Sequence, residues 1–206
     1  MAHIPDGVLT APVLIAGALA SAGLLAVALR RLDYDRLPQA AVLAAGFFVS
    51  SLIQIPFGVT SVHLLLNGLM GLLLGWTAVP ALLVALTLQT VFFGYGGALV
   101  LGVNTFNLAL PALICALLLS PWLARAAGRQ VFWIGALAGL LGVLLSGVLV
   151  ALSLAASGEA FLPAAWAILL AYVPLALVEA LITGTVVAFL QRVEPGLLGV
   201  AEATHD

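Results

Sequence analysis

The stretch VFWIGALAGLLGVLLSGVLVALSLAA, residues 131–156, decides the fold class of this chain. It contains no charged side chain, and it is longer than the roughly 20 apolar residues with which a helix crosses a bilayer. Six further apolar runs occur at 8–29, 40–57, 62–79, 81–101, 106–123 and 164–189. We therefore predict an all-α integral membrane protein with about seven transmembrane helices. They form a single domain over residues 1–206, with a short N-terminal segment (1–7) and a tail (190–206).

The composition supports a bilayer environment. Hydrophobic residues make up 65% of the chain and charged residues 7%, whereas a soluble domain is about a quarter charged. The single cysteine, Cys115, excludes a disulfide framework or a thiolate cluster. All basic residues are arginine, so a phosphate-binding Gly-Lys-Ser/Thr loop is absent, and ATP-driven work would need a partner.

The arginines predict the orientation in the membrane, because basic residues gather in cytoplasmic loops. Turn-forming residues separate the runs at 37–38, 55–58, 79–80, 102–104, 127–128 and 157–163. The arginines follow the first, fifth and seventh runs, at Arg30, Arg31, Arg36, Arg125, Arg129 and Arg192. Seven spans then place every arginine and the C-terminus in the cytoplasm and the N-terminus outside, in a multi-pass plasma (inner) membrane protein.

Two histidines are candidate metal ligands. The N-terminus has no basic region, so we expect no cleaved signal peptide and a chain start that is available for chemistry. His3 lies in this segment and His63 at the outer end of the third run, so the topology brings both to one membrane face. His205 lies in the polar tail, where we expect it to be solvated. In the alternative, His3 is an incidental polar residue and His63 bonds to a carbonyl at a helix end.

A histidine near a free amine can wrap a metal ion in a square plane of nitrogens, which favours Ni(II) or Cu(II). If Met1 is retained, its amine, the amides of Ala2 and His3, and the His3 ring supply four nitrogens. If Met1 is removed, the Ala2 amine with the amide and ring of His3 supplies three. His63 would then complete the plane.

Four motifs resemble the cobalt/nickel substrate-specific membrane subunit of energy-coupling factor transporters, the CbiM/NikM family, from residue 3 to about 198. They are His3-Ile4-Pro5-Asp6-Gly7, Thr60-Ser61-Val62-His63-Leu64-Leu65, Gly102-Val103-Asn104-Thr105-Phe106-Asn107 and Glu179-Ala180-Leu181-Ile182-Thr183-Gly184. The resemblance implies an N-terminal segment that folds into the bundle from outside. It also implies that the mature amine, the second-residue histidine and a histidine like His63 hold the ion. One inserted alanine departs from the usual Met-His start, so the resemblance favours removal of Met1.

Other polar residues could support this site. We expect Asn104 and Asn107 to hydrogen-bond the ligand histidines, with capping of a helix by Asn104 as the alternative. Glu179 lies within a span with no cation at membrane depth, which makes it a functional candidate. We expect it to be hydrogen-bonded inside the bundle. Gln54, Asn67 and Gln89 are expected in helix–helix hydrogen bonds, although Asn67 lies one turn from His63.

The sequence thus predicts a binding subunit for Co(II) or Ni(II) uptake, with no catalytic cofactor and no nucleic-acid partner. The resemblance implies a transmembrane coupling subunit, ATPase subunits and often a small accessory membrane protein as partners. One alternative is a stand-alone proton-coupled metal transporter that uses Glu179 as its proton carrier. A remote alternative is an intramembrane hydrolase with a dyad of Ser61 and His63.

Overall fold

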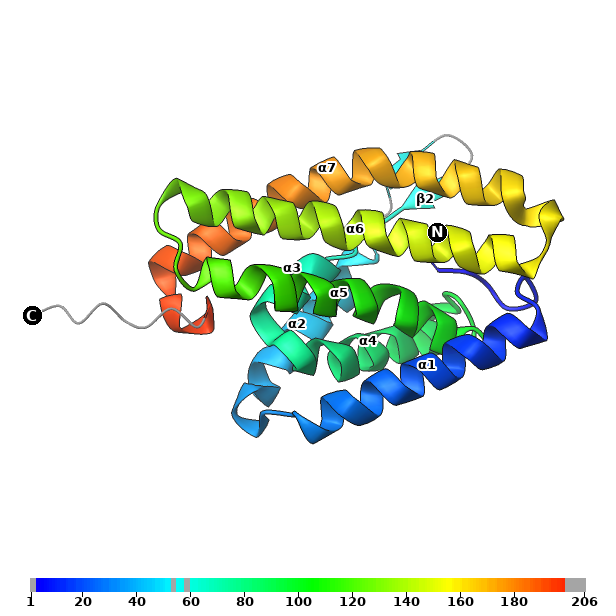
Figure 1. Ribbon diagram of the computed structural model, residues 1–206, viewed down its shortest axis with the longest axis horizontal. Coiled ribbons are helices and arrows are strands. Elements are labelled where there is room, and N and C mark those ends of the chain that lie inside the picture. The colour runs from blue at the N-terminus through cyan, green and yellow to red at the C-terminus, as the bar shows by residue number, and fades with distance from the viewer. Residues whose placement is uncertain (1–2, 53–54, 58–59, 199–206) are drawn as a thin grey trace, which may run out of the picture.

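The computed structural model describes residues 3–52, 55–57 and 60–198, with the two short strands described by their backbone alone. The expected all-helical membrane fold is confirmed, with one small hairpin added (Figure 1). The elements in chain order are α1 (Ala11–Arg30), η1 (Tyr34–Arg36), α2 (Leu37–Ser50), β1 (Ile55–Phe57), β2 (Thr60–Val62), α3 (Asn67–Leu74), η2 (Gly75–Thr77), α4 (Ala78–Phe93), α5 (Leu101–Leu123), α6 (Arg129–Ser157), η3 (Glu159–Phe161), α7 (Leu162–Val193) and η4 (Pro195–Leu198).

Five helical stretches of the described chain are long and apolar enough to cross a membrane. They are Ala11–Arg30, Asn67–Phe93, Leu101–Leu123, Arg129–Ser157 and Glu159–Val193. Helix α2 has only 14 residues, a length of about 21 Å at 1.5 Å per residue, which is short of a hydrocarbon core of about 30 Å. The protein is therefore a multi-pass membrane protein, and the count of seven spans stays a prediction.

The long helices pack side by side, with α6 between α5 and α7, and α5 between α6 and α1 (Figure 1). Small residues allow the close contacts that helices need in lipid. A Cβ on Gly71 would collide with the carbonyl of Ala112 in α5, and one on Gly139 would collide with the carbonyl of Glu179 in α7. Gly71 and Gly139 thus lie where helix backbones touch.

Helices α3 and α4 meet at a different residue from the one that the sequence predicts. The runs 62–79 and 81–101 place the break at Val79-Pro80, but the chain turns at Gly75, which has φ +55°. Only glycine adopts this left-handed region without strain. Pro80 instead lies in the first turn of α4, where a proline breaks no helical hydrogen bond.

The start of α5 also differs from the prediction. The run 106–123 begins after a predicted break at 102–104, yet α5 begins at Leu101 and α4 ends at Phe93. Gly94, at φ +65°, terminates α4 in the left-handed conformation typical of a helix C-terminus. Residues 94–100 therefore form the connection, and Asn104 lies inside the helix rather than at its cap.

The predicted run 40–57 is helical only as far as Ser50. Strands β1 and β2 then form an antiparallel hairpin in which Ile55 pairs with Val62 and Phe57 with Thr60. Pro56 cannot donate an amide hydrogen to a helix, so it favours this extended arrangement. The hairpin delivers the chain to His63, which directly follows β2.

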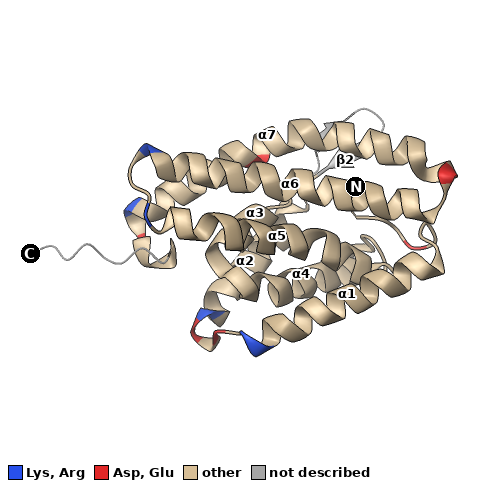
Figure 2. Cartoon of the chain, viewed as in Figure 1, with Lys and Arg blue, Asp and Glu red and all other residues tan. Residues whose placement is uncertain are grey.

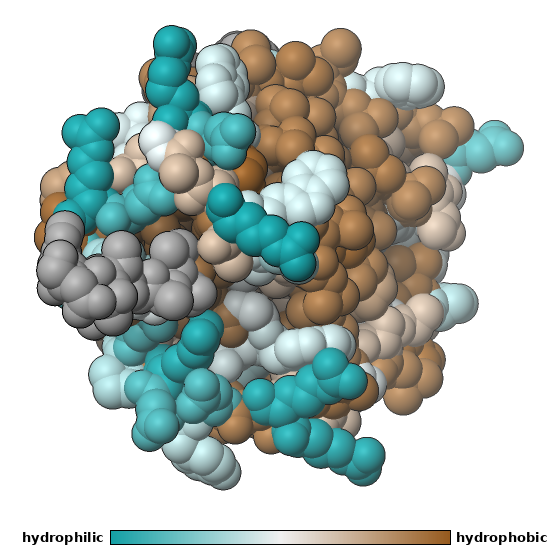
Figure 3. Space-filling view, turned by 60° about the vertical axis from the view of Figure 1, so that its left-hand side comes forward, coloured by the Kyte–Doolittle hydropathy of each residue, from teal (hydrophilic) through white to brown (hydrophobic). Residues whose placement is uncertain are grey.

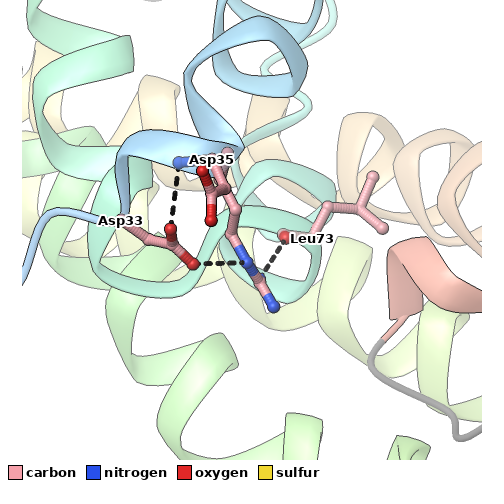
Figure 4. Close-up of polar contacts among 4 residues, drawn as sticks. Asp33, Asp35 and Leu73 are labelled. Atoms are coloured by element: carbon pink, nitrogen blue, oxygen red, sulfur yellow. Dashed lines mark hydrogen bonds and ion pairs between the residues drawn. The ribbon is translucent and has the colours of Figure 1, made fainter.

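The arginines gather at one end of the bundle, and the N-terminal segment lies towards the other (Figure 2). Figure 3, turned to bring the arginine end forward, shows hydrophilic side chains there beside a broad apolar flank. Arg36 lies 3.4 Å from Asp33 and donates to the carbonyl of Leu73 at 3.3 Å, which ties the α1–α2 connection to the end of α3 (Figure 4). Which end faces the cytoplasm stays a prediction.

Candidate metal site

The residues from His3 to Thr10 form a segment that enters the helix bundle. The side chains of Ile4 and Leu9 are buried in an apolar cluster with Val100, Val103 and Leu154. Burying such side chains contributes about 1.5–3 kcal/mol each. The N-terminal segment is thus packed as part of the core, and it carries His3 into the interior.

Asn104 of α5 holds this segment through Ile4. Its amide nitrogen donates to the Ile4 carbonyl at 3.1 Å, and its amide oxygen accepts the Ile4 N–H at 3.2 Å. This pair satisfies both backbone groups of a buried residue, which would otherwise be costly. The expected bond from Asn104 to a histidine is therefore wrong among the described residues, as is the expected cap, because Val100 is the N-cap of α5. Asn104 supports His3 through the next residue.

Asp6 binds the start of α5. Its carboxylate accepts the N–H of Val100 at 3.0 Å, and its own N–H donates to the Gly96 carbonyl at 3.2 Å. A carboxylate at a helix N-terminus is stabilised by unpaired N–H groups and by the helix dipole. A Cβ on Gly97 would collide with the Asp6 carboxyl group, so the glycine-rich connection is shaped to receive the segment. The sequence analysis did not single out this role, although Asp6 stood in the quoted motif.

His3 and His63 meet in the interior. Their Nε2 atoms are 3.2 Å apart, and the residues are 4% and 2% exposed. Two nitrogens that bind one ion at about 2.0–2.1 Å are about 2.9 Å apart at a right angle and about 3.3 Å apart at a tetrahedral angle. The separation therefore suits one shared ion.

The hydrogen bond on the far side of His63 defines its tautomer. Its Nδ1 lies 2.9 Å from the Leu64 carbonyl, an acceptor alone, so Nδ1 carries the hydrogen and Nε2 keeps a lone pair. Burial lowers the pKa of His63, and it lowers the pKa of His3 to about 3, with His63 beside it adding to the effect. Both rings are thus held neutral, the form that binds metals. The alternative prediction, that His63 bonds to a carbonyl, therefore holds as well. The same bond leaves Nε2 of His63 free to bind a metal ion.

The described residues contain no group of three or more His, Cys, Asp or Glu side chains that could hold a metal ion. A complete site would therefore need backbone nitrogens or the terminal amine beside the two histidines. The predicted amine ligands Met1 and Ala2 lie outside the described residues. In the described arrangement Nε2 of His3 faces His63, whereas a chelate with the His3 backbone amide uses Nδ1.

Glu179 reaches from α7 to the chain that follows His63. Its Oε1 accepts the N–H groups of Leu65 and Leu66, the latter at 3.0 Å. Leu66 has φ +47° and precedes the first residue of α3, so the carboxylate stabilises a strained helix start. Glu179 is fully buried, and its Oε2 has no hydrogen-bond partner among the described residues. It is hydrogen-bonded within the bundle, and it positions the loop that carries His63.

The remaining predicted supporting residues lie elsewhere. The Asn67 amide donates to the carbonyls of Leu108 and Gly142 and to Ser146 Oγ, so it joins α3 to α5 and α6 as expected. Asn107 donates to Ser153 at 3.4 Å, and the bond expected from it to a histidine is wrong within the described chain. Gln54 lies outside the described residues.

Gln89 is a residue that the sequence analysis assigned incorrectly. Its side chain is fully buried, and neither amide atom makes a hydrogen bond with the described residues, although a polar interaction with His3 raises the histidine pKa against the larger effect of burial. We expected an ordinary helix–helix hydrogen bond. Only the folded arrangement brings the carboxamide beside His3.

A cavity of about 450 Å³ lies beside His3. Its walls are the N-terminal segment on one side and apolar side chains of α6, η3 and α7 on the other, among them Val150, Leu154 and Phe161. The segment is thus bonded to α5 through Asn104 and to the end of α6 through Ser157, and it borders this cavity.

The chain is similar in sequence to known metal transport proteins. Residues 3–197 match the family model described as the cobalt uptake substrate-specific transmembrane region, CbiM. A putative metal transport protein of Haemophilus influenzae is 40% identical over 97% of this chain and 98% of its own length. The fused nickel transport protein NikMN of Rhodobacter capsulatus is 34% identical over 98% of this chain and 65% of its own.

Solved structures show the same fold. The crystal structure of a transition metal transporter has a TM-score of 0.81 and 27% identity, and the match covers 94% of each chain. That of a truncated transition metal transporter has a TM-score of 0.80 and 26% identity, over 92% of this chain and 98% of the other. The chain therefore belongs to the CbiM family, as a multi-pass membrane component of cobalt or nickel uptake and not an enzyme.

Proposed function

We propose that this chain captures a Ni(II) or Co(II) ion on nitrogen ligands and presents it to an ATP-driven energy-coupling factor system. The observation that carries the proposal is the buried pair of Nε2 atoms, 3.2 Å apart, on His3 and His63. His63 contributes a lone pair because its other nitrogen is bonded to Leu64. The remaining ligands would be the N-terminal amine, which belongs to Ala2 if Met1 is removed, and, where the His3 ring binds through Nδ1 instead of Nε2, the backbone amide of His3.

The donor set agrees with the class of metal. Imidazole and amide nitrogens suit Ni(II), Cu(II) and Co(II), whereas Mg(II) and Ca(II) take oxygen ligands. Copper would be bound most tightly by such ligands, so the choice between nickel and cobalt depends on geometry and metal supply. The relative from Rhodobacter capsulatus is named as a nickel transport protein, and the family description names cobalt.

Release would follow from moving the N-terminal segment. His3 belongs to this segment while His63 belongs to the bundle, so withdrawing the segment separates the two ligands. The bonds that must break are few: those of Ile4 with Asn104, those of Asp6 with Gly96, Leu99 and Val100, and that of Thr10 with Ser157. A transmembrane coupling subunit, ATPases and possibly a small accessory subunit would drive this movement, because the chain has no phosphate-binding loop.

Metal binding by the purified protein tests the proposal. Ni(II) and Co(II) titrations by calorimetry would use protein with its native start, checked for Met1 by mass spectrometry. His63→Ala should abolish tight binding, and His205→Ala, the matched control for the remaining histidine, should bind as wild type does. Undiminished binding by His63→Ala would exclude the shared site, and no binding by the wild type would refute metal capture.

Uptake assays test the coupling. With ATPase and coupling subunits co-expressed, uptake should depend on ATP and survive loss of the proton gradient. The proton-coupled alternative expects uptake by the chain alone, which stops without the gradient and in Glu179→Gln.

A further inference from the structure

The two histidines differ in how their second ring nitrogens are held. Nδ1 of His63 has a fixed partner, the Leu64 carbonyl at 2.9 Å. For His3, the group beside the ring is the carboxamide of Gln89. A metal-bound histidine almost always donates its other ring N–H to an acceptor, and this bond orients the ring. The partner of His63 is therefore present, and that of His3 has to be identified.

Gln89 has the properties that such a partner needs. Its side chain is completely buried, and both amide atoms lack hydrogen bonds within the described residues. A buried polar group without a partner costs roughly 1–3 kcal/mol, so it is retained only where something uses it. Among the described residues, His63 and Gln89 are the side chains that interact with the His3 ring.

The backbone of Gln89 also takes part in seating the segment. Its carbonyl accepts the N–H of Tyr95 at 3.3 Å, and the next residue, Gly96, accepts the N–H of Asp6. A Cβ on Gly96 would lie 3.6 Å from the Cβ of His3. The end of α4 and the connection 94–97 thus form one support beneath His3.

We propose that Gln89 is a positioning residue of the metal site, whose carboxamide hydrogen-bonds the ring nitrogen of His3 that does not bind the ion. This inference rests on the proposed function for its metal-bound state. A carboxamide both donates and accepts, so it can serve two tautomers of the ring. In the described arrangement neither amide atom makes a hydrogen bond with the ring, whose Nε2 faces Nε2 of His63. With metal, Oε1 of Gln89 accepts the ring N–H, and the ion takes the nitrogen that the proton has left.

The first test is metal affinity. Gln89→Leu keeps the size of the side chain and removes both hydrogen-bonding atoms, and it should weaken Ni(II) binding by roughly 10–100-fold, the usual cost of losing such a partner. Gln89→Glu restores the acceptor and should recover most of the affinity. Gln39→Leu, a matched change in α2, should bind as wild type does. Equal affinity of Gln89→Leu and wild type would overturn the proposal, as would a failure of Gln89→Glu to improve on Gln89→Leu.

The second test separates positioning from folding and needs no metal. The chain has 3 histidines, so ¹⁵N-histidine labelling gives three pairs of ring resonances, and their shifts report the tautomer of each ring. Gln89→Leu should shift the His3 pair and leave the His63 pair in its Nδ1–H form. An unchanged His3 pair, or equal disturbance of all three, would refute a specific role. If the wild type binds no metal, the proposed function fails, while the metal-free tautomer still tests Gln89.

Discussion

Replacing Asn104 by alanine tests whether seating of the N-terminal segment controls metal affinity. The change removes both hydrogen bonds to Ile4, of 3.1 and 3.2 Å, and leaves a buried N–H and a buried carbonyl unpaired. Each such group costs about 1–3 kcal/mol, so the seated segment loses about 2–6 kcal/mol relative to an open one. Water satisfies these groups in the open state, which is therefore favoured.

The loss of affinity follows from the fraction of molecules with the segment seated. The apparent Kd equals the intrinsic Kd divided by that fraction. Once the open state dominates, each further 1.4 kcal/mol of destabilisation of the seated state raises the apparent Kd about tenfold. The wild-type protein prefers the seated state, so the first part of the lost free energy only removes this preference and changes the Kd little. We expect Asn104→Ala to weaken Ni(II) binding by about 10–100-fold in calorimetry, and hydrogen exchange of the Ile4 amide to speed up in metal-free protein.

Asn107→Ala is the matched control. It removes the same side chain from the same helix, but Asn107 bonds to Ser153 in α6 and not to the segment. We expect its Ni(II) affinity to stay within a few-fold of wild type. Wild-type affinity in Asn104→Ala, or an equal loss in both variants, would refute the claim that this anchor holds the ligand in place.

Three other changes follow from the same structure. Glu179→Ala leaves the Leu65 and Leu66 amides unpaired and should lower the free energy of unfolding by about 2–6 kcal/mol. Glu179→Gln keeps an acceptor and should lower it less. Equal thermal unfolding temperatures of the two variants in detergent would contradict this role. Gly97→Ala collides with the Asp6 carboxyl group and places an L residue at φ +155°, so it should weaken Ni(II) binding and also lower the thermal unfolding temperature, and normal affinity would show that the connection is not shaped for the segment. Burial lowers the pKa of His3 from 6.5 to about 3, so between these pH values His3 is protonated when the segment is open and neutral when it is seated. Protection of the Ile4 amide from hydrogen exchange should therefore hold above pH 6.5 and fall by up to about tenfold per pH unit below it. Constant protection down to pH 5 would contradict the burial of His3.

Sequence reasoning succeeded where the signal is local. A long apolar run without charges satisfies its backbone only as a helix in lipid, so residues such as 131–156 identify their own structure. The meeting of His3 and His63 was also accessible, because each carries ligand chemistry, while the ion that they would share stays a proposal. Topology required only that both lie on one side of the membrane. The turn at Gly75 was missed because proline at position 80 gave the stronger local signal, although a proline is harmless in a first helical turn.

The supporting residues could not be predicted in the same way. Asn104 has the composition of a helix cap, but it bonds to Ile4, which lies 100 positions away. Glu179 looks like an isolated membrane carboxyl until α7 packs beside the start of α3. A polar side chain offers donors and acceptors in any setting, and its partner depends on which backbone groups the packed helices leave unpaired.

The sequence by itself determined that the chain lies in a membrane, that it is helical, and that two histidines are its candidate metal ligands, because these follow from hydrophobicity and from side-chain chemistry. The tertiary structure alone decided how those ligands are held: Asp6 at the start of α5, Asn104 on Ile4, Glu179 behind His63 and Gln89 beside His3. The physical reason is that apolar burial in lipid depends on composition over a window, whereas hydrogen bonds depend on positions of single atoms, which only the packed bundle specifies.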